Sequence, residues 1–62
     1  MIVGLGTIGS RLAKLAKAFD MRVLATKRNT AVENHDVDEL HASTKVADLL
    51  PQADFVALTC PL

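Results

Sequence analysis

Apolar and polar positions follow two different periods along the first half of this 62-residue chain. A short β-branched apolar run, Ile2 to Leu5, is typical of a buried strand. Thr7 to Phe19 shows helical spacing instead, with basic side chains on the opposite face. The apolar positions of this helix are Ile8, Leu12, Leu15, Ala16 and Phe19, and the basic positions are Arg11, Lys14 and Lys17. Met21 to Thr26, with three apolar residues in a row, predicts the second strand.

The second half of the chain alternates in the same way, but with shorter elements. Residues 27–36 are polar and aperiodic, which predicts a loop. Val37 to His41 predicts a short strand, and Thr44 to Leu50 predicts a short helix that ends by Pro51. Ala53 to Thr59 has the apolar run of a further buried strand. This alternation indicates an α/β fold with a parallel sheet, in which ligands bind at the carboxyl ends of the strands.

The chain carries Gly4-Leu5-Gly6-Thr7-Ile8-Gly9, a G-x-G-x-x-G motif, between the first strand and the first helix. In such a turn Gly4 permits the sharp reversal, Gly6 allows the backbone to approach a pyrophosphate, and Gly9 lets the helix pack close to the strand. Free backbone N–H groups and the helix dipole favour an anion there. The motif predicts a dinucleotide site on a partial Rossmann-type doubly wound sheet, about one βαβαβ half.

The residues after the second strand bear on the choice of cofactor. An NAD site of this class usually has an acid about 20 residues beyond the glycines, but this strand ends Thr26-Lys27-Arg28-Asn29. Lys27 and Arg28 would neutralise the 2′-phosphate that distinguishes NADP from NAD. We therefore expect NADP(H) to be favoured over NAD(H), with Arg28 the more important if both side chains point inward. The alternative is that the two basic residues are simply solvated.

Length and charge limit what the chain does alone. A complete dinucleotide domain has two such halves, so we expect residues 1–62 to be part of an NAD(P)-binding domain whose substrate domain lies outside this chain. The net charge is zero, yet residues 1–28 contain six basic residues and one acid, and residues 29–62 contain one basic residue and six acids. The basic front half suits a phosphate-bearing ligand, although solvated helix faces also account for it.

Several functional classes are disfavoured by composition. With two Phe, no Tyr and no Trp, the chain has little with which to stack bases, so no nucleic-acid partner is expected. No run approaches the roughly 20 apolar residues of a membrane span, and a cytoplasmic location is the default expectation. The single cysteine, Cys60, excludes an internal disulfide. The acids Glu33, Asp36, Asp38 and Glu39 lack the spacing of a calcium loop and are expected to be solvated, with no metal site.

Two blocks of the sequence resemble the coenzyme domain of D-isomer-specific 2-hydroxyacid dehydrogenases. The first, Gly4 to Val23, holds the glycine motif and its helix. The second, Asp48 to Leu62, is an acidic-leucine helix followed by Ala-Asp, an apolar strand and Pro-Leu, and is the more specific of the two. The resemblance spans nearly the whole chain. It implies that Thr7 and Ile8 contact the pyrophosphate, largely through their backbone N–H groups.

The resemblance also assigns residues at the end of the second block. It implies that Cys60 and Pro61 line the cofactor cleft beside the dinucleotide. The family often has His where this chain has Thr59 and Asp where it has Lys27. Lys27 in place of this Asp suggests NADP preference, as in members similar to glyoxylate or hydroxypyruvate reductases.

The resemblance implies that the whole protein is an NADP(H)-dependent oxidoreductase that interconverts a 2-hydroxy acid and a 2-oxo acid. It also implies a homodimer. The family's catalytic Arg, Glu and His would lie beyond Leu62, so no catalytic residue is assigned here. His35 and His41 are expected to be solvated, and Cys60 is not expected to be a nucleophile. The alternatives are a non-catalytic dinucleotide sensor similar to the corepressors of this family, an inactive truncated product, or a glycine turn that only packs strand to helix.

Overall fold

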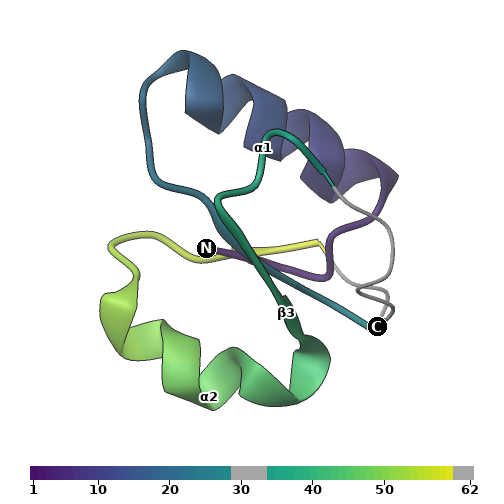
Figure 1. Cartoon of the computed structure of the whole chain (residues 1–62), viewed down its shortest axis with the longest axis vertical. Coiled ribbons are helices and arrows are strands. Elements are labelled where there is room, and N and C mark those ends of the chain that lie inside the picture. Colours follow the sequence, from purple (N-terminus) through teal and green to yellow (C-terminus); the bar gives the residue numbers. More distant parts are fainter. Residues whose placement is uncertain (29–33, 60–62) are drawn as a thin grey trace.

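A four-stranded parallel sheet lies between two helical layers in the computed structural model, which describes residues 1–28 and 34–59 (Figure 1). The strands are β1 (Ile2–Val3), β2 (Leu24–Lys27), β3 (Glu39–Ala42) and β4 (Ala57–Leu58). Helix α1 (Thr7–Ala18) covers one face. The other face is covered by α2 (Val46–Leu49) with a 3₁₀ turn on each side, Ser43–Lys45 and Leu50–Gln52. The predicted α/β fold is confirmed as part of a Rossmann-type domain.

The strand order β3-β2-β1-β4 places β1 between β2 and β4. Ile2 is the register partner of Ala25 on one side and of Ala57 on the other. The chain therefore runs outward from β1 to β3 and then returns to the opposite side of β1. A sheet of this kind has its crevice where the order reverses, outside the carboxyl ends of the central strands. In this chain that point lies after β1 and β4, so the glycine motif and Thr59 meet there.

The hydrophobic core lies between α1 and the sheet. Its buried members are Ile2, Leu5, Ala13, Val23 and Ala25. Only Gly9 and Ala13 of α1 are fully buried, so the inward stripe of the helix is made of small residues. Small residues allow the helix backbone to approach β1 closely.

The predicted apolar face of α1 is only partly right. Leu12 and Ala16 pack on the core, but Ile8, Leu15 and Phe19 are 72%, 61% and 79% exposed. The reason is the rotation of the helix: the stripe that contains Gly9 and Ala13 turns to the sheet, and the larger residues lie at its margin. Periodicity identifies an apolar side of a helix but not which part of that side meets the sheet.

The predicted strands are present, but their boundaries differ. The first ends at Val3 rather than Leu5, because Gly4 has a φ of 86° and leaves the extended region. The third begins at Glu39 rather than Val37 and extends to Ala42. The predicted buried strand Ala53–Thr59 is wrong in extent: β4 comprises two residues, and Phe55 and Leu58 are exposed. It is an edge strand in the described sheet, so its backbone pairs on one side only.

The other boundaries also move by a few residues. The second strand runs Leu24–Lys27 instead of Met21–Thr26, so Lys27 is its last residue rather than the first of a loop. The predicted helix Thr44–Leu50 is one α-helical turn between two 3₁₀ turns. None of the helices in the described parts of the chain is long and apolar enough to cross a membrane.

Helix α1 ends in a tight reversal at Asp20, which has a φ of 59°. The N–H of Met21 donates to the carbonyl of Ala16 at 3.1 Å, and the N–H of Asp20 donates to the carbonyl of Lys17 at 2.9 Å. This is the pairing of a Schellman cap, whose left-handed position favours glycine.

Asp20→Gly is therefore expected to raise the free energy of unfolding by about 0.5–1 kcal/mol, and Asp20→Val to lower it. Chemical denaturation of the protein that carries this chain measures both. Equal stability of the two variants would contradict the assignment of left-handed strain at this residue.

Candidate functional site

The glycine turn is anchored to the end of β2. The N–H groups of Gly4 and Leu5 both donate to the carbonyl of Thr26, at 3.1 and 2.8 Å. Gly4 adopts its positive φ at this point, a conformation that a residue with a Cβ reaches only with strain. The turn thus leaves β1, is held by β2, and enters α1 at Thr7.

The two later glycines have different surroundings. A Cβ placed on Gly6 would meet nothing within 4 Å, so this backbone faces open space. A Cβ placed on Gly9 would lie 2.8 Å from Oγ1 of Thr59 and 3.1 Å from Cγ2 of Ile2. Gly9 is therefore required by packing within the protein, whereas Gly6 leaves the backbone accessible to a ligand.

The amino end of α1 is suited to an anion. Its N-cap residue is Gly6, which supplies no side-chain cap, and the first turn contains no acid. The first N–H groups of any helix lack partners within the helix, and the dipole places partial positive charge there. A phosphate beside Thr7 and Ile8 would accept these hydrogen bonds and be stabilised by the dipole.

A groove of about 670 Å³ opens beside this turn. This volume falls within the range of roughly 300–1,000 Å³ common for ligand pockets. It brings together six of the residues that the sequence predicts to bind cofactor: Gly4, Gly6, Thr7, Ile8, Lys27 and Arg28. Gly9 is buried behind the turn instead. Cys60 and Pro61, also predicted from the sequence, lie outside the described residues.

Six further residues that line the groove were not predicted as site residues: Val3, Leu5, Thr26, Ser43, Val46 and Thr59. Thr26 and Thr59 lie at or just beyond the carboxyl ends of β2 and β4, and Ser43 directly follows β3. For Thr26, Ser43 and Thr59, the position at a strand end is the signal that would have found them, because all parallel strands end at the same edge of the sheet.

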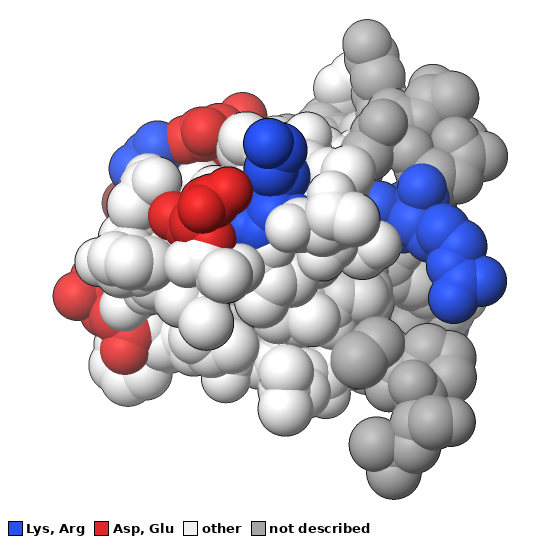
Figure 2. All heavy atoms as spheres, turned by 90° about the horizontal axis from the view of Figure 1, so that it is seen from below, with Lys and Arg blue, Asp and Glu red and all other residues white. Residues whose placement is uncertain are grey.

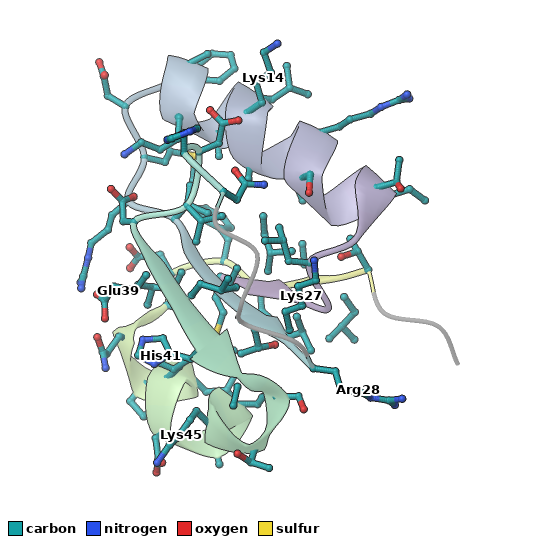
Figure 3. All side chains as sticks on the ribbon, turned by 45° about the vertical axis from the view of Figure 1, so that its right-hand side comes forward. Lys14, Lys27, Arg28, Glu39, His41 and Lys45 are labelled. Carbon is teal, nitrogen blue, oxygen red and sulfur yellow. The ribbon has the colours of Figure 1, made fainter. Side chains whose placement is uncertain are left out.

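Lys27 and Arg28 lie on one wall of the groove but differ in orientation. Lys27 is half-buried at the end of β2, and its side chain runs toward the loop that leads into α1 (Figure 3). Arg28 is exposed and extends outward (Figure 3). Arg28 was expected to contribute more to the cofactor preference only if both side chains pointed inward. This condition is not met. Lys27 is the residue better placed beside the turn.

The groove is free of acidic side chains among the described residues that line it. On the face shown in Figure 2, red side chains gather toward the left, and the blue group at the right edge has no described red side chain beside it. Among the described residues, an anion in this groove would therefore meet basic side chains and backbone N–H groups and no carboxylate.

A second groove, of about 310 Å³, lies at the other end of α1. It is lined mainly by apolar side chains, including Leu15, Phe19, Phe55 and Val56. It lacks the glycine turn and the amino end of the helix, so it offers no comparable set of donors for phosphate. The groove at the glycine turn is therefore the candidate site.

Asp38 and Glu39 are engaged in ion pairs rather than simply solvated, which corrects the expectation from sequence for these two residues. Both carboxylate oxygens of Asp38 accept hydrogen bonds from Nζ of Lys17, at 2.9 and 3.0 Å, and one also accepts from the N–H of Val23 at 2.6 Å. The Val23 N–H and then the Lys17 ammonium lower the pKa of Asp38. This carboxylate joins α1 to the start of β2.

Glu39 forms a second pair of contacts on the exposed edge of the sheet. One carboxylate oxygen lies 3.1 Å from Nε2 of His41 and the other accepts a hydrogen bond from Arg22. Both contacts lower the pKa of Glu39, and the contact with His41 has the larger effect. His41 is thus bonded to Glu39, where solvation alone was expected. His35 is exposed, and Glu33 lies outside the described residues. Within residues 1–28 and 34–59 there is no cluster of three metal-ligating side chains.

The lowered pKa of Asp38 predicts a loss of stability in acid. The stabilisation is present above the ordinary value of 3.8 and is lost as the pH falls through the lower value of the folded state. Asp38→Asn should therefore flatten the acid side of the stability–pH curve, measured by denaturant unfolding at a series of pH values. Asp54→Asn, at an exposed carboxylate, is the matched control. Identical curves for Asp38→Asn and the unmodified protein would contradict this role.

All 62 residues match the family model for the NAD binding domain of D-isomer specific 2-hydroxyacid dehydrogenases. The chain belongs to this family. The resemblance carried by the glycine motif and by the C-terminal block is thereby confirmed. Folds of this kind bind ligands outside the carboxyl ends of the strands, which is where the groove at the glycine turn lies.

Curated relatives of the 2-hydroxyacid dehydrogenase family align along nearly the whole chain. A glyoxylate reductase of Pyrococcus horikoshii is 47% identical over 62 residues, which are 98% of this chain and 18% of the relative. A hydroxypyruvate reductase of Blautia hydrogenotrophica is 40% identical over 63 residues, and a glyoxylate reductase of Thermococcus gammatolerans is 42% identical over 62 residues, with the same coverage. The chain thus spans about 18% of the length of these relatives. No solved structure gives a significant match.

Proposed function

We propose that the protein carrying this chain is an NADP(H)-preferring oxidoreductase that reduces a 2-oxo acid to a 2-hydroxy acid. The observation that supports the cofactor choice is the position of Lys27 and Arg28 on the wall of the same groove as the glycine turn, without a carboxylate among its described lining residues. The substrate class is supported by the relatives, which are named glyoxylate and hydroxypyruvate reductases.

The physical argument for NADP rests on charge. An NAD site of this fold commonly ends β2 with an acid that accepts hydrogen bonds from the adenosine ribose. A carboxylate there would repel a 2′-phosphate, whereas Lys27 at the end of β2 and Arg28 after it offer an ammonium and a guanidinium. Hydrogen bonds between such cations and phosphate are about twice as strong as neutral ones.

In this proposal residues 1–62 supply part of the cofactor domain and no catalytic side chain. The dinucleotide supplies hydride chemistry when bound. Backbone N–H groups at Gly6, Thr7 and Ile8 bind the pyrophosphate, Gly4 and Gly9 give the turn its shape, and Cys60 and Pro61 line the cleft. The groups that bind the substrate and transfer its proton belong to parts of the protein outside these 62 residues.

Titration of the protein with NADPH and with NADH, followed by the fluorescence of the reduced nicotinamide, tests the proposal. We expect NADPH to bind at least about tenfold more tightly, since one charge-assisted contact contributes roughly 1.5–3 kcal/mol. Glyoxylate and hydroxypyruvate are then added and oxidation of NADPH is measured. Equal affinities would contradict the cofactor preference, and binding without turnover of any 2-oxo acid would favour the non-catalytic sensor.

The same family membership extends the proposal to a cytoplasmic homodimer, as implied by the resemblance. Light scattering on the protein measures the mass of the assembly, and a monomer would contradict this part of the proposal without affecting the cofactor site.

A further inference from the structure

Thr59 directly follows β4 and contacts the glycine turn from the side of β1 opposite to β2. Its backbone N–H donates to the carbonyl of Val3 at 3.0 Å. Its hydroxyl donates to the carbonyl of Gly4 at 2.8 Å, although the two residues are 55 positions apart in the sequence. The same Oγ1 lies 3.4 Å from the carbonyl oxygen of Val3. The side chain therefore bonds the first residue of the turn directly.

The same hydroxyl also lies beside the first turn of α1. Oγ1 of Thr59 is the nearest atom to the position that a Cβ on Gly9 would occupy, at 2.8 Å. It thus fills the space left by the missing side chain of α1. Thr59 thus contacts the first residue of the turn, Gly4, and lies against Gly9 in the first turn of α1.

Gly4 is consequently held from both neighbouring strands. Its N–H donates to the carbonyl of Thr26 in β2 at 3.1 Å, and its carbonyl accepts from Thr59 after β4 at 2.8 Å. Two bonds on the peptide groups of one residue with a φ of 86° restrict its rotation. A turn restrained before binding loses less conformational entropy when it orders around a ligand.

We propose that Thr59 is a positioning residue for the dinucleotide: its hydroxyl holds the glycine turn in the conformation that directs the backbone N–H groups of Gly6 and Thr7 at the pyrophosphate. This inference rests on the dinucleotide binding of the proposed function but not on the preference for NADP. Because the pyrophosphate is common to both cofactors, Thr59 acts equally on NADPH and NADH, unlike Lys27 and Arg28.

Three variants separate the hydroxyl from the rest of the side chain. Thr59→Val keeps the shape but replaces the donor with a methyl group, which cannot remain 2.8 Å from the Gly4 carbonyl. Thr59→Ala removes both the hydroxyl and the methyl group of the threonine and adds no clash. Thr59→Ser keeps the hydroxyl. We expect Thr59→Val and Thr59→Ala each to weaken the binding of NADPH and of NADH by about tenfold, because one hydrogen bond is lost. Thr59→Ser should retain most of the affinity of the unmodified protein.

The experiment measures the dissociation constants of both reduced cofactors for the protein and its three variants, together with the thermal unfolding midpoint of each without cofactor. Weaker binding in Val and Ala, recovery in Ser and an unchanged NADPH-to-NADH ratio support the inference. Unchanged affinity with a lowered midpoint would overturn it, because the hydroxyl would then be purely structural. If the unmodified protein binds both cofactors equally, the NADP preference fails while this comparison still decides the role of Thr59; if it binds neither, both proposals fail.

Discussion

Replacing Lys27 with Asp and Arg28 with Ser is expected to reverse the cofactor preference, changing the ratio of kcat/KM for NADPH over that for NADH by about 100-fold or more. In the proposed NADP site, this change removes two charge-assisted contacts to the 2′-phosphate, each worth roughly 1.5–3 kcal/mol. In addition, the new carboxylate repels the phosphate and can accept hydrogen bonds from the ribose hydroxyls of NADH. Kinetics of 2-oxo acid reduction with each cofactor give the ratio.

The orientation of the two side chains sharpens this expectation. Lys27 is half-buried and runs toward the turn, whereas Arg28 is exposed, so Lys27→Asp alone should account for most of the change. The contribution of Arg28 should decrease as salt is added, since an exposed charge is screened within about 10 Å at 0.1 M ionic strength.

The matched control uses the same residue types away from the groove. Lys14→Asp with Arg11→Ser changes two exposed positions of α1 that are not among the groove residues. It alters the net charge by the same amount and should leave the ratio unchanged. If both double variants shift the ratio equally, the effect is one of overall charge and the assignment of Lys27 and Arg28 is wrong.

Gly9→Ala and Gly6→Ala are expected to fail in different ways. A Cβ on Gly9 would lie 2.8 Å from Oγ1 of Thr59, 3.1 Å from Cγ2 of Ile2 and 3.2 Å from the carbonyl oxygen of Gly4. Such overpacking costs about 1–3 kcal/mol, because β1, β4 and α1 must separate to admit it. The free energy of unfolding should fall by that amount, and cofactor binding should weaken because the turn moves.

Gly6→Ala is the complementary variant. A Cβ there meets no protein atom within 4 Å, so the free energy of unfolding should fall by less than about 1 kcal/mol, the scale of an altered N-cap. The added methyl group does obstruct the approach of a pyrophosphate to the backbone, so affinity for both dinucleotides should fall by about tenfold or more. Denaturant unfolding and cofactor titration on both variants measure the difference. Equal loss of stability in the two would contradict the separate roles of these glycines.

The site was predictable from sequence where it depends on neighbours along the chain. The glycine turn is defined by six consecutive residues between a strand and a helix. Lys27 and Arg28 could be placed beside it because parallel strands present their carboxyl ends at one edge of the sheet, whichever residues lie between. The rest of the site depends on tertiary contacts. In the sequence, Thr59 is notable only as a departure from the family pattern, and its hydrogen bond to the Gly4 carbonyl joins residues 55 positions apart.

The alternation of apolar periods in this sequence was sufficient to predict an α/β fold, and the glycine motif was sufficient to predict the turn that lines the candidate groove, since both depend on local spacing. Only the tertiary structure decided that Leu12 and Ala16 rather than Leu15 and Phe19 pack on the core, and that Asp38 pairs with Lys17. Those outcomes depend on how α1 is rotated against the sheet and on which distant side chains the strand order brings within hydrogen-bonding distance, and no local pattern specifies either.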